Sequence, residues 1–304
     1  MRAQTGLSGS AVDQRSGHKL FIEGHDESFD RTVMGELLGE LGVAVRPLGP
    51  CRNIRAAAQA LHVNEPTYYF LIDRDYHDEA DVERSWQNFP DPNTHNLLIW
   101  RKRELENYFL DPEYLAASPW LVPGTTVDTL REKIRQEAQQ RIYLEAANLV
   151  LVEVRERQKH SPVEEFKGPE QFQCEADAVA RLLGHAALRK RPEVLAEELA
   201  DERLVERLTR VLDRLFGDAE HCTLRWDVGT WRDEVSGKQI YRAVVNRYFH
   251  VKDHLGQRLT GKDPASGTDP EKEVVKSLLK RPLIEQPKDF QELVGLLAKR
   301  LRPR

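Results

Sequence analysis

The stretch that decides the fold of this 304-residue chain is YYFLIDRD, at residues 68–75. Residues 68–72 are apolar or aromatic, a run with the length and composition of a fully buried strand. Asp73 and Asp75 follow directly. Because they stand two positions apart at the end of an extended segment, both carboxylates can face the same cation. We therefore expect a buried strand that ends in a pair of acidic side chains.

Short apolar runs elsewhere predict three more strands, at residues 18–22, 43–45 and 96–100. Apolar residues recur at helical spacing over 26–41, and a further helix is predicted over 53–61. Strands of four to six residues that alternate with helices are typical of a parallel sheet wrapped by helices. The predicted fold class is α/β.

Acidic side chains follow two of these other strands. Glu23 comes directly after the strand at 18–22, and Glu104 and Glu106 come shortly after the strand at 96–100. Ligands of open parallel sheets bind outside the carboxyl ends of the strands, so these groups can converge with the aspartates. Carboxylates suit hard cations such as Mg²⁺, and sites with two such ions stabilise both oxygens of a phosphodiester during cleavage.

Three segments carry a resemblance to a known family. FIEG at 21–24, FLIDRD at 70–75 and WRKRELENYFL at 100–110 resemble a Toprim domain. The first two motifs are general to Toprim domains. The third narrows the resemblance to the overcoming-lysogenization-defect (OLD) type of Toprim nuclease and its stand-alone relatives in the DUF4435 group. The resemblance covers residues 18–115.

The resemblance implies a site for two divalent ions, Mg²⁺ or Mn²⁺. Glu23 would bind metal or assist proton transfer, and Glu27 stands where these nucleases more often have aspartate. Glu106 has an alternative role, because it could turn inward to cap the short helix that follows it. The implied metal ligands are Glu23, Glu27, Asp73, Asp75, Glu104 and Glu106.

A late segment, SGKQIY at 236–241, resembles the glycine-lysine element of the same proteins. There the lysine returns to the metal site and stabilises charge on the phosphate, which gives Lys238 a catalytic role. A solvated lysine at a helix start is the alternative. His25 and His77 stand beside the implied ligands and could contact phosphate.

Composition suggests two domains after an N-terminal tail. Residues 1–17 lack periodicity and are expected to form a flexible tail. We expect a Toprim catalytic domain over 18–120 and a mostly helical domain over 121–304 that contributes Lys238 to the site. Long helical patterns at 126–160 and 192–216 support the second domain.

Charge is distributed unevenly between these parts. Residues 18–121 carry 10 Lys and Arg against 18 Asp and Glu, whereas residues 122–304 carry 33 against 31. Acidic residues that converge on metal, with basic residues elsewhere that hold a polyanion, would produce this split. Uneven surface charge without function would produce it as well.

Several classes are disfavoured by the sequence. No apolar run is long enough to span a membrane, the N-terminus lacks a secretory pattern, and the three cysteines form no CxxC, so a cytoplasmic location is expected. The near-match to a nucleotide-binding loop at 256–263 ends in Asp263, which lacks the hydroxyl that would bind Mg²⁺.

The resemblance then implies a function. We expect a metal-dependent endonuclease that cleaves RNA such as tRNA, or DNA. It would be a toxic effector of bacterial anti-phage defence, as in PARIS-type systems, controlled by an ABC-type ATPase encoded separately, and a homodimer is plausible. The alternative is a catalytically silent module of Toprim shape that docks on an ATPase.

Overall fold

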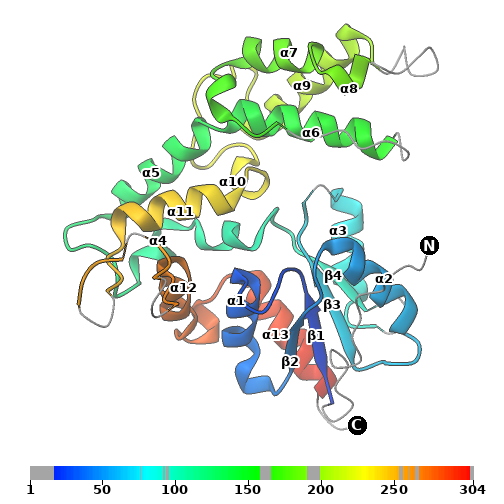
Figure 1. The fold of residues 1–304 in the computed structure, drawn as a ribbon, viewed down its shortest axis with the longest axis vertical. Helices are drawn as coiled ribbons and strands as arrows, with labels where there is room; N and C mark the ends of the chain where they lie inside the picture. The colour runs from blue at the N-terminus through cyan, green and yellow to red at the C-terminus, as the bar shows by residue number, and fades with distance from the viewer. Residues whose placement is uncertain are drawn as a thin grey trace. The chain divides into compact units, whose positions relative to one another are not determined.

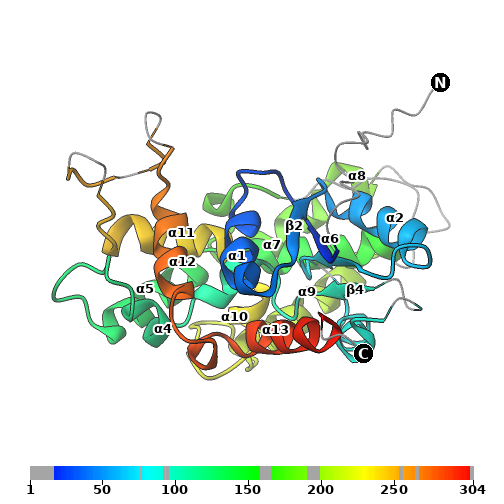
Figure 2. The same ribbon diagram turned by 90° about the horizontal axis from the view of Figure 1, so that it is seen from below.

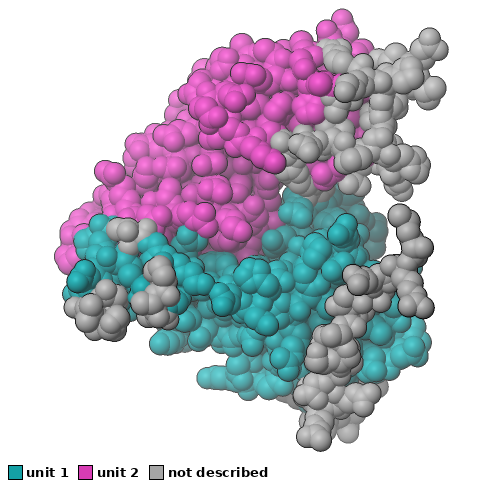
Figure 3. Space-filling model, viewed as in Figure 1, with its two compact units in different colours: residues 1–101, 118–120, 250–304 teal, residues 102–117, 121–249 magenta. Residues whose placement is uncertain are grey.

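The computed structural model of the chain divides into two compact units, shown in Figure 3. The first contains residues 1–101, 118–120 and 250–304, and the second contains residues 102–117 and 121–249. The residues described are 17–75, 77–91, 93, 96–157, 166–189, 199–252, 256–259, 261–263 and 267–301. The expected tail at 1–17 therefore lies outside the described residues, apart from Gly17.

A four-stranded parallel sheet forms the centre of the first unit, in the order β2-β1-β3-β4 (Figure 1). Every residue of β1 and β3 is buried, which explains why these strands show no alternation and, apart from Lys19, are made of apolar and aromatic residues. The predicted α/β class, a parallel sheet flanked by helices, is confirmed. The strands are β1 Lys19–Ile22, β2 Ala44–Pro47, β3 Tyr68–Ile72 and β4 Leu97–Ile99.

Three helices connect the strands: α1 Phe29–Leu38 (continued by η2 Gly39–Leu41), α2 Cys51–Leu61 and α3 Glu79–Asn88. The side chain of Ser28 caps α1, and that of Asp78 caps α3. Right-handed crossovers put α2 and α3 on one face of the sheet and α1 on the other, because the chain reverses direction across the sheet after β2. The helix α3 was not among the predicted elements.

The C-terminal segment returns to the first unit. It contains α12 Pro270–Leu279, η7 Leu283–Glu285 and α13 Lys288–Leu301, and both α-helices pack against α1 (Figures 1 and 2). The ring of buried Phe290 lies 5.6 Å from that of Trp100, which follows β4. The compact units therefore assign residues 250–304 differently from the boundary expected near residue 120.

The second unit consists of helices and their connections. Within it α6 packs against α7 and α9, and α11 packs against α5 and η4. The helix expected over 126–160 is two helices, separated at Gln140 and Arg141, and the pattern at 192–216 contains α9; residues 158–160 and 192–198 lie outside the described residues. The elements are η4 Leu105–Phe109, α4 Pro112–Ala116, α5 Val127–Gln139, α6 Ile142–Arg157, η5 Pro169–Gln171, α7 Glu175–Leu183, α8 Ala186–Arg189, α9 Asp201–Phe216, α10 Trp231–Glu234 and α11 Gly237–Tyr248.

Among the described helices, none combines the length and the apolar character that crossing a membrane requires.

Candidate active site

The strand ends of β1 and β3 place Glu23 beside the predicted aspartates. Phe21 pairs with Phe70 in the parallel ladder, so Glu23 and Asp73 emerge next to each other at the carboxyl edge of the sheet. The backbone N–H of Asp73 donates to Glu23 Oε1 at 3.1 Å. The structure thus brings together the strand-end glutamate and the first aspartate of the DRD motif.

Glu23 is a partly buried carboxylate among other acids. Burial is the largest influence and raises its pKa, and the negative charges of Asp75 and Asp30 raise it further. Backbone N–H groups of Asp73 and Cys51 oppose this by hydrogen bonding to the charged form, and the resulting pKa is about 7. The Glu23 carboxyl can therefore hold or release a proton near neutral pH.

The backbone around Glu23 and Asp75 is specialised. Gly24 adopts a φ of +91° and forms an antiparallel bridge with Gly49, and a Cβ at Gly24 would come within 2.7 Å of Ser28. The "EG" motif is therefore required for the close approach of the β1 end to the start of α1. Asp75 has a φ of +43°, so the chain turns at the last residue of the DRD motif. Asp75 is exposed.

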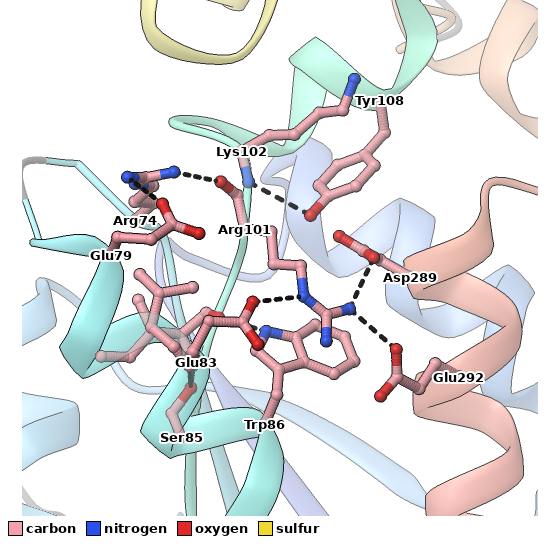
Figure 4. Close-up of polar contacts among 12 residues, drawn as sticks. Arg74, Glu79, Glu83, Ser85, Trp86, Arg101, Lys102, Tyr108, Asp289 and Glu292 are labelled. Carbon is pink, nitrogen blue, oxygen red and sulfur yellow. Dashed lines mark hydrogen bonds and ion pairs between the residues drawn. The ribbon is translucent and has the colours of Figure 1, made fainter. Parts of the chain in front are cut away.

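Arg74, between the two aspartates, fixes the loop that carries them. Its guanidinium donates to the backbone carbonyl of Arg101 at 2.8 Å and to Glu79 Oε2 at 2.8 Å (Figure 4). It also donates to the carbonyl of His77 at 3.3 Å. The loop after β3 is thereby tied to the end of β4 and to the start of α3.

Arg101 links the end of β4 to α3 and α13 at this edge of the first unit. Its guanidinium lies 4.0 Å from the centre of the Trp86 ring and pairs with Glu83, Asp289 and Glu292 (Figure 4). The Trp86 ring N–H donates to the carbonyl of Ile99, at the end of β4. Because Asp289 and Glu292 belong to α13, the C-terminal helix helps to hold the strand end that Arg74 contacts.

Glu27, which the resemblance implies as a metal ligand, lies beside two lysines. It is exposed, and Lys262 Nζ lies 2.7 Å from its Oε2. Lys272 hydrogen-bonds the carbonyl of the same residue. The hydrogen bond and charge of Lys262 hold the pKa of Glu27 below its ordinary value. Asp30, in the first turn of α1, is instead one of the two carboxylates that raise the pKa of Glu23.

Sequence reasoning missed Asp30, although a signal for it exists. Ser28 is a typical N-cap, and acidic residues favour the first turn of a helix, so an acid two residues after the cap was readable. Its proximity to Glu23 follows from the tight turn at Gly24, which brings the start of α1 back to the end of β1.

Glu104 and Lys238 come together within the second unit. Ser236 Oγ donates to both oxygens of Glu104, at 3.1 and 3.0 Å, and the backbone N–H of Lys238 donates to Oε2 at 2.8 Å. A Cβ at Gly237 would clash with the Asn107 side chain, so the glycine of the "GK" element allows α11 to begin against η4. The Lys238 side chain is exposed.

Glu104 also caps η4 through a reciprocal pair of contacts with Asn107, whereas Glu106 is buried within η4. Asn107 donates in addition to the carbonyls of Arg232 and Val235, both at 2.9 Å. The E-x-E-N run therefore organises the junction of η4, α10 and α11. Glu104 and Glu106 belong to the second unit, and Glu23, Asp73 and Asp75 belong to the first.

The carboxylates of the first unit fit a hard divalent cation by their chemistry. Glu23, Asp73 and Asp75 offer oxygen donors at one sheet edge, where burial first, and then the negative charges of Asp75 and Asp30, raise the pKa of Glu23. Across the described part of the chain, no group of three or more His, Cys, Asp or Glu side chains is arranged so that it could hold a metal ion.

Comparisons with protein-family models, with curated proteins and with solved structures found no match for this chain.

Proposed function

We propose that this protein is a divalent-metal-dependent endonuclease that hydrolyses phosphodiester bonds in RNA or DNA. One observation carries the proposal: the backbone N–H of Asp73, at the end of β3, donates to the Glu23 carboxylate, at the end of β1, on the carboxyl edge of a parallel sheet, with Asp75 close enough to influence Glu23. Ligands of such sheets bind at this edge. The Toprim-like motifs at the same positions support the assignment.

Each residue of the edge has a chemical task in this proposal. Asp73 and Asp75 would hold the cation, and Glu23 would hold it or accept the proton of the attacking water. When bound, Mg²⁺ or Mn²⁺ supplies an activated water and offsets charge on the phosphate. Arg74 positions both aspartates through its contacts with Arg101 and Glu79. Glu104, Glu106 and Lys238 stay predicted contributors, which single alanine variants test.

The sequence resemblance extends the proposal to biology. Stand-alone relatives of the OLD type act beside separate ATPases in anti-phage defence, so we propose a cytoplasmic toxic effector controlled by such a partner. A homodimer would supply paired sites for cutting two strands or a folded RNA.

The direct test is a cleavage panel of plasmid, single-stranded DNA and tRNA, with Mg²⁺ or Mn²⁺, with and without the product of a neighbouring ATPase gene. Wild-type protein should cleave at least one substrate only when metal is present. Asp73→Asn should lower cleavage by at least about a hundredfold, because a ligand of the cation is lost. Glu36→Gln, which neutralises an exposed acid of α1, is the matched control and should cleave as wild type does.

The alternative, a silent module that docks on an ATPase, makes the opposite forecast. Asp73→Asn should then bind the ATPase and support its action as wild type does, and no substrate in the panel should be cut.

A further inference from the structure

The helix α2 carries an arginine, Arg55, near the carboxylates at the edge of the sheet. The backbone N–H of Cys51, the first residue of α2, hydrogen-bonds Glu23, and Arg55 follows one helical turn later. Burial raises the pKa of the Cys51 thiol, and the nearby positive charge of Arg55 lowers it. The first turn of α2 therefore carries a contact to Glu23 and, near it, the guanidinium of Arg55.

A second contact comes from the loop after β3. Arg55 Nη2 lies 2.5 Å from His77 Nε2 and 3.1 Å from His77 Nδ1. His77 follows Asp75 by two residues, so the side chain of Arg55 connects α2 to the loop that carries the aspartates.

The partners of Arg55 leave much of its hydrogen-bonding capacity unused. Among the described residues no carboxylate pairs with it, whereas Arg74 pairs with Glu79 and Arg101 pairs with three acids. A guanidinium has five N–H donors, and a thiol and an imidazole are modest acceptors for them. The planar fork of arginine matches carboxylate and phosphate oxygens, often through two bonds at once.

We propose that Arg55 binds a phosphate of the nucleic-acid backbone beside the carboxylates of Glu23, Asp73 and Asp75. This inference rests on the proposed function, because it names Arg55 as the side chain that holds the nucleic-acid substrate of that site. The chain would thus place a fixed positive group next to an acidic edge that otherwise repels a polyanion. His77 acts as a positioning residue, since it holds the guanidinium.

The chain offers a matched control. Arg52 is also an exposed arginine of α2, three residues earlier, and within the described part of the chain its guanidinium makes no hydrogen bond to His77. Arg52→Ala and Arg55→Ala remove the same charge from the same helix. Only Arg55→Ala removes it from beside the carboxylate edge.

The experiment measures binding of a fluorescein-labelled single-stranded oligonucleotide to the full chain in EDTA, by fluorescence anisotropy over a series of salt concentrations. Arg55→Ala should weaken binding by at least about tenfold and lower the salt slope by about 0.7, as expected for one lost phosphate contact. Arg52→Ala should stay within about twofold of wild type, and Arg55→Lys should recover part of the loss, because lysine retains the charge but not the fork.

Equal binding by the two alanine variants would overturn the inference, and so would the absence of binding by wild-type protein. The proposed function is judged separately, by cleavage with metal. Cleavage that survives Arg55→Ala leaves the nuclease assignment intact and removes only the role of Arg55. Loss of binding in Arg55→Ala by a protein that never cleaves would keep the phosphate contact and reject the nuclease.

Discussion

At the scale of single residues, the most informative group is Glu23, because its surroundings act on its proton in opposite directions. Burial and the charges of Asp75 and Asp30 disfavour the ionised form, while two backbone N–H groups favour it. The outcome is a pKa of about 7, far above the ordinary value of 4.5. Without metal, the ionised glutamate therefore destabilises the fold that contains it.

The stability of the metal-free first unit should consequently fall between pH 4.5 and 7. In that window the folded state keeps a proton that the unfolded chain has released, so unfolding becomes easier as the pH rises. At pH 8, Glu23→Gln should be more stable than wild type by on the order of 2 kcal/mol, and the two should converge near pH 4. Hydrogen exchange of β1 and β3 amides in EDTA measures this.

Glu36→Gln is the control for this prediction, because it changes an exposed acid of α1. A gain from Glu23→Gln that is equally large at pH 5 and pH 8 would show that the substitution acts through packing and not through ionisation.

Glu27 and Asp30 show what the sequence leaves unseen around a site. The resemblance implies Glu27 as a metal ligand, four positions after Glu23. Its carboxylate is paired with Lys262, which lies 235 residues further on and has no signal near Glu27 in the sequence. Asp30 reaches Glu23 because α1 starts so soon after the glycine turn.

At the scale of elements, α7 and α9 are joined by a buried histidine. His221 Nε2 lies 2.8 Å from Asp213 of α9, and Nδ1 lies 3.1 Å from Glu175 of α7. Burial alone would lower the pKa of His221, but the hydrogen bonds and charges of the two acids raise it above 6.5. Protonated His221 therefore forms ion pairs with both helices and links α7 to α9.

The ion pairs of His221 should make the second unit more stable in mild acid than in base. The contribution is complete below the unfolded pKa of about 6.5 and is lost as the pH rises through the higher folded pKa. His221→Asn should lower the free energy of unfolding by about 1–3 kcal/mol at pH 6 and by clearly less at pH 9. The reason is that the histidine is protonated in acid, so the substitution removes charged hydrogen bonds only there. Asparagine suits the backbone here, since residue 221 has a φ of +52°.

Hydrogen exchange of α7 and α9 amides at the two pH values is the measurement for His221. A loss of protection that is the same at pH 6 and pH 9 would mean that the histidine acts through shape and not through charge.

The strands were the most predictable elements. β1 and β3 show no alternation because both of their faces are buried, and all four strands lie within a residue or two of their predicted positions. The sequence shows no clear helical pattern for α3, because its buried residues are only Val82 and Trp86 and their neighbours are charged. The convergence of Glu23 with Asp73 followed from the strand-end rule for parallel sheets.

At the scale of the whole molecule, the first unit is assembled from segments far apart in the sequence. The last helix, α13, supplies Phe290 against Trp100 and two carboxylates to Arg101. Nothing local marks residues 250–304 as partners of the sheet, because the contacts that recruit them depend on residues nearly 200 positions earlier. The boundary expected near residue 120 could not reveal this return of the chain.

Truncation of one buried ring should therefore weaken the sheet. Phe290 is fully buried, so Phe290→Ala should destabilise the first unit by about 3–5 kcal/mol through lost burial and a cavity. Ile284→Ala, in the exposed turn just before α13, should change stability by less than about 0.5 kcal/mol. Hydrogen exchange should show the loss in β1, β3 and β4. Equal protection in both variants would contradict the assignment of α13 to this unit.

The central claim, that the carboxylates of the first unit bind a divalent cation, is tested most directly by counting bound Mn²⁺. Electron paramagnetic resonance distinguishes free from bound Mn²⁺ during a titration of the full chain. Wild type and Glu36→Gln should bind the ion equally, and Asp73→Asn should bind it at least about tenfold more weakly, a loss of about 1.4 kcal/mol. Identical binding by all three proteins, or no binding at millimolar Mn²⁺, would contradict the account.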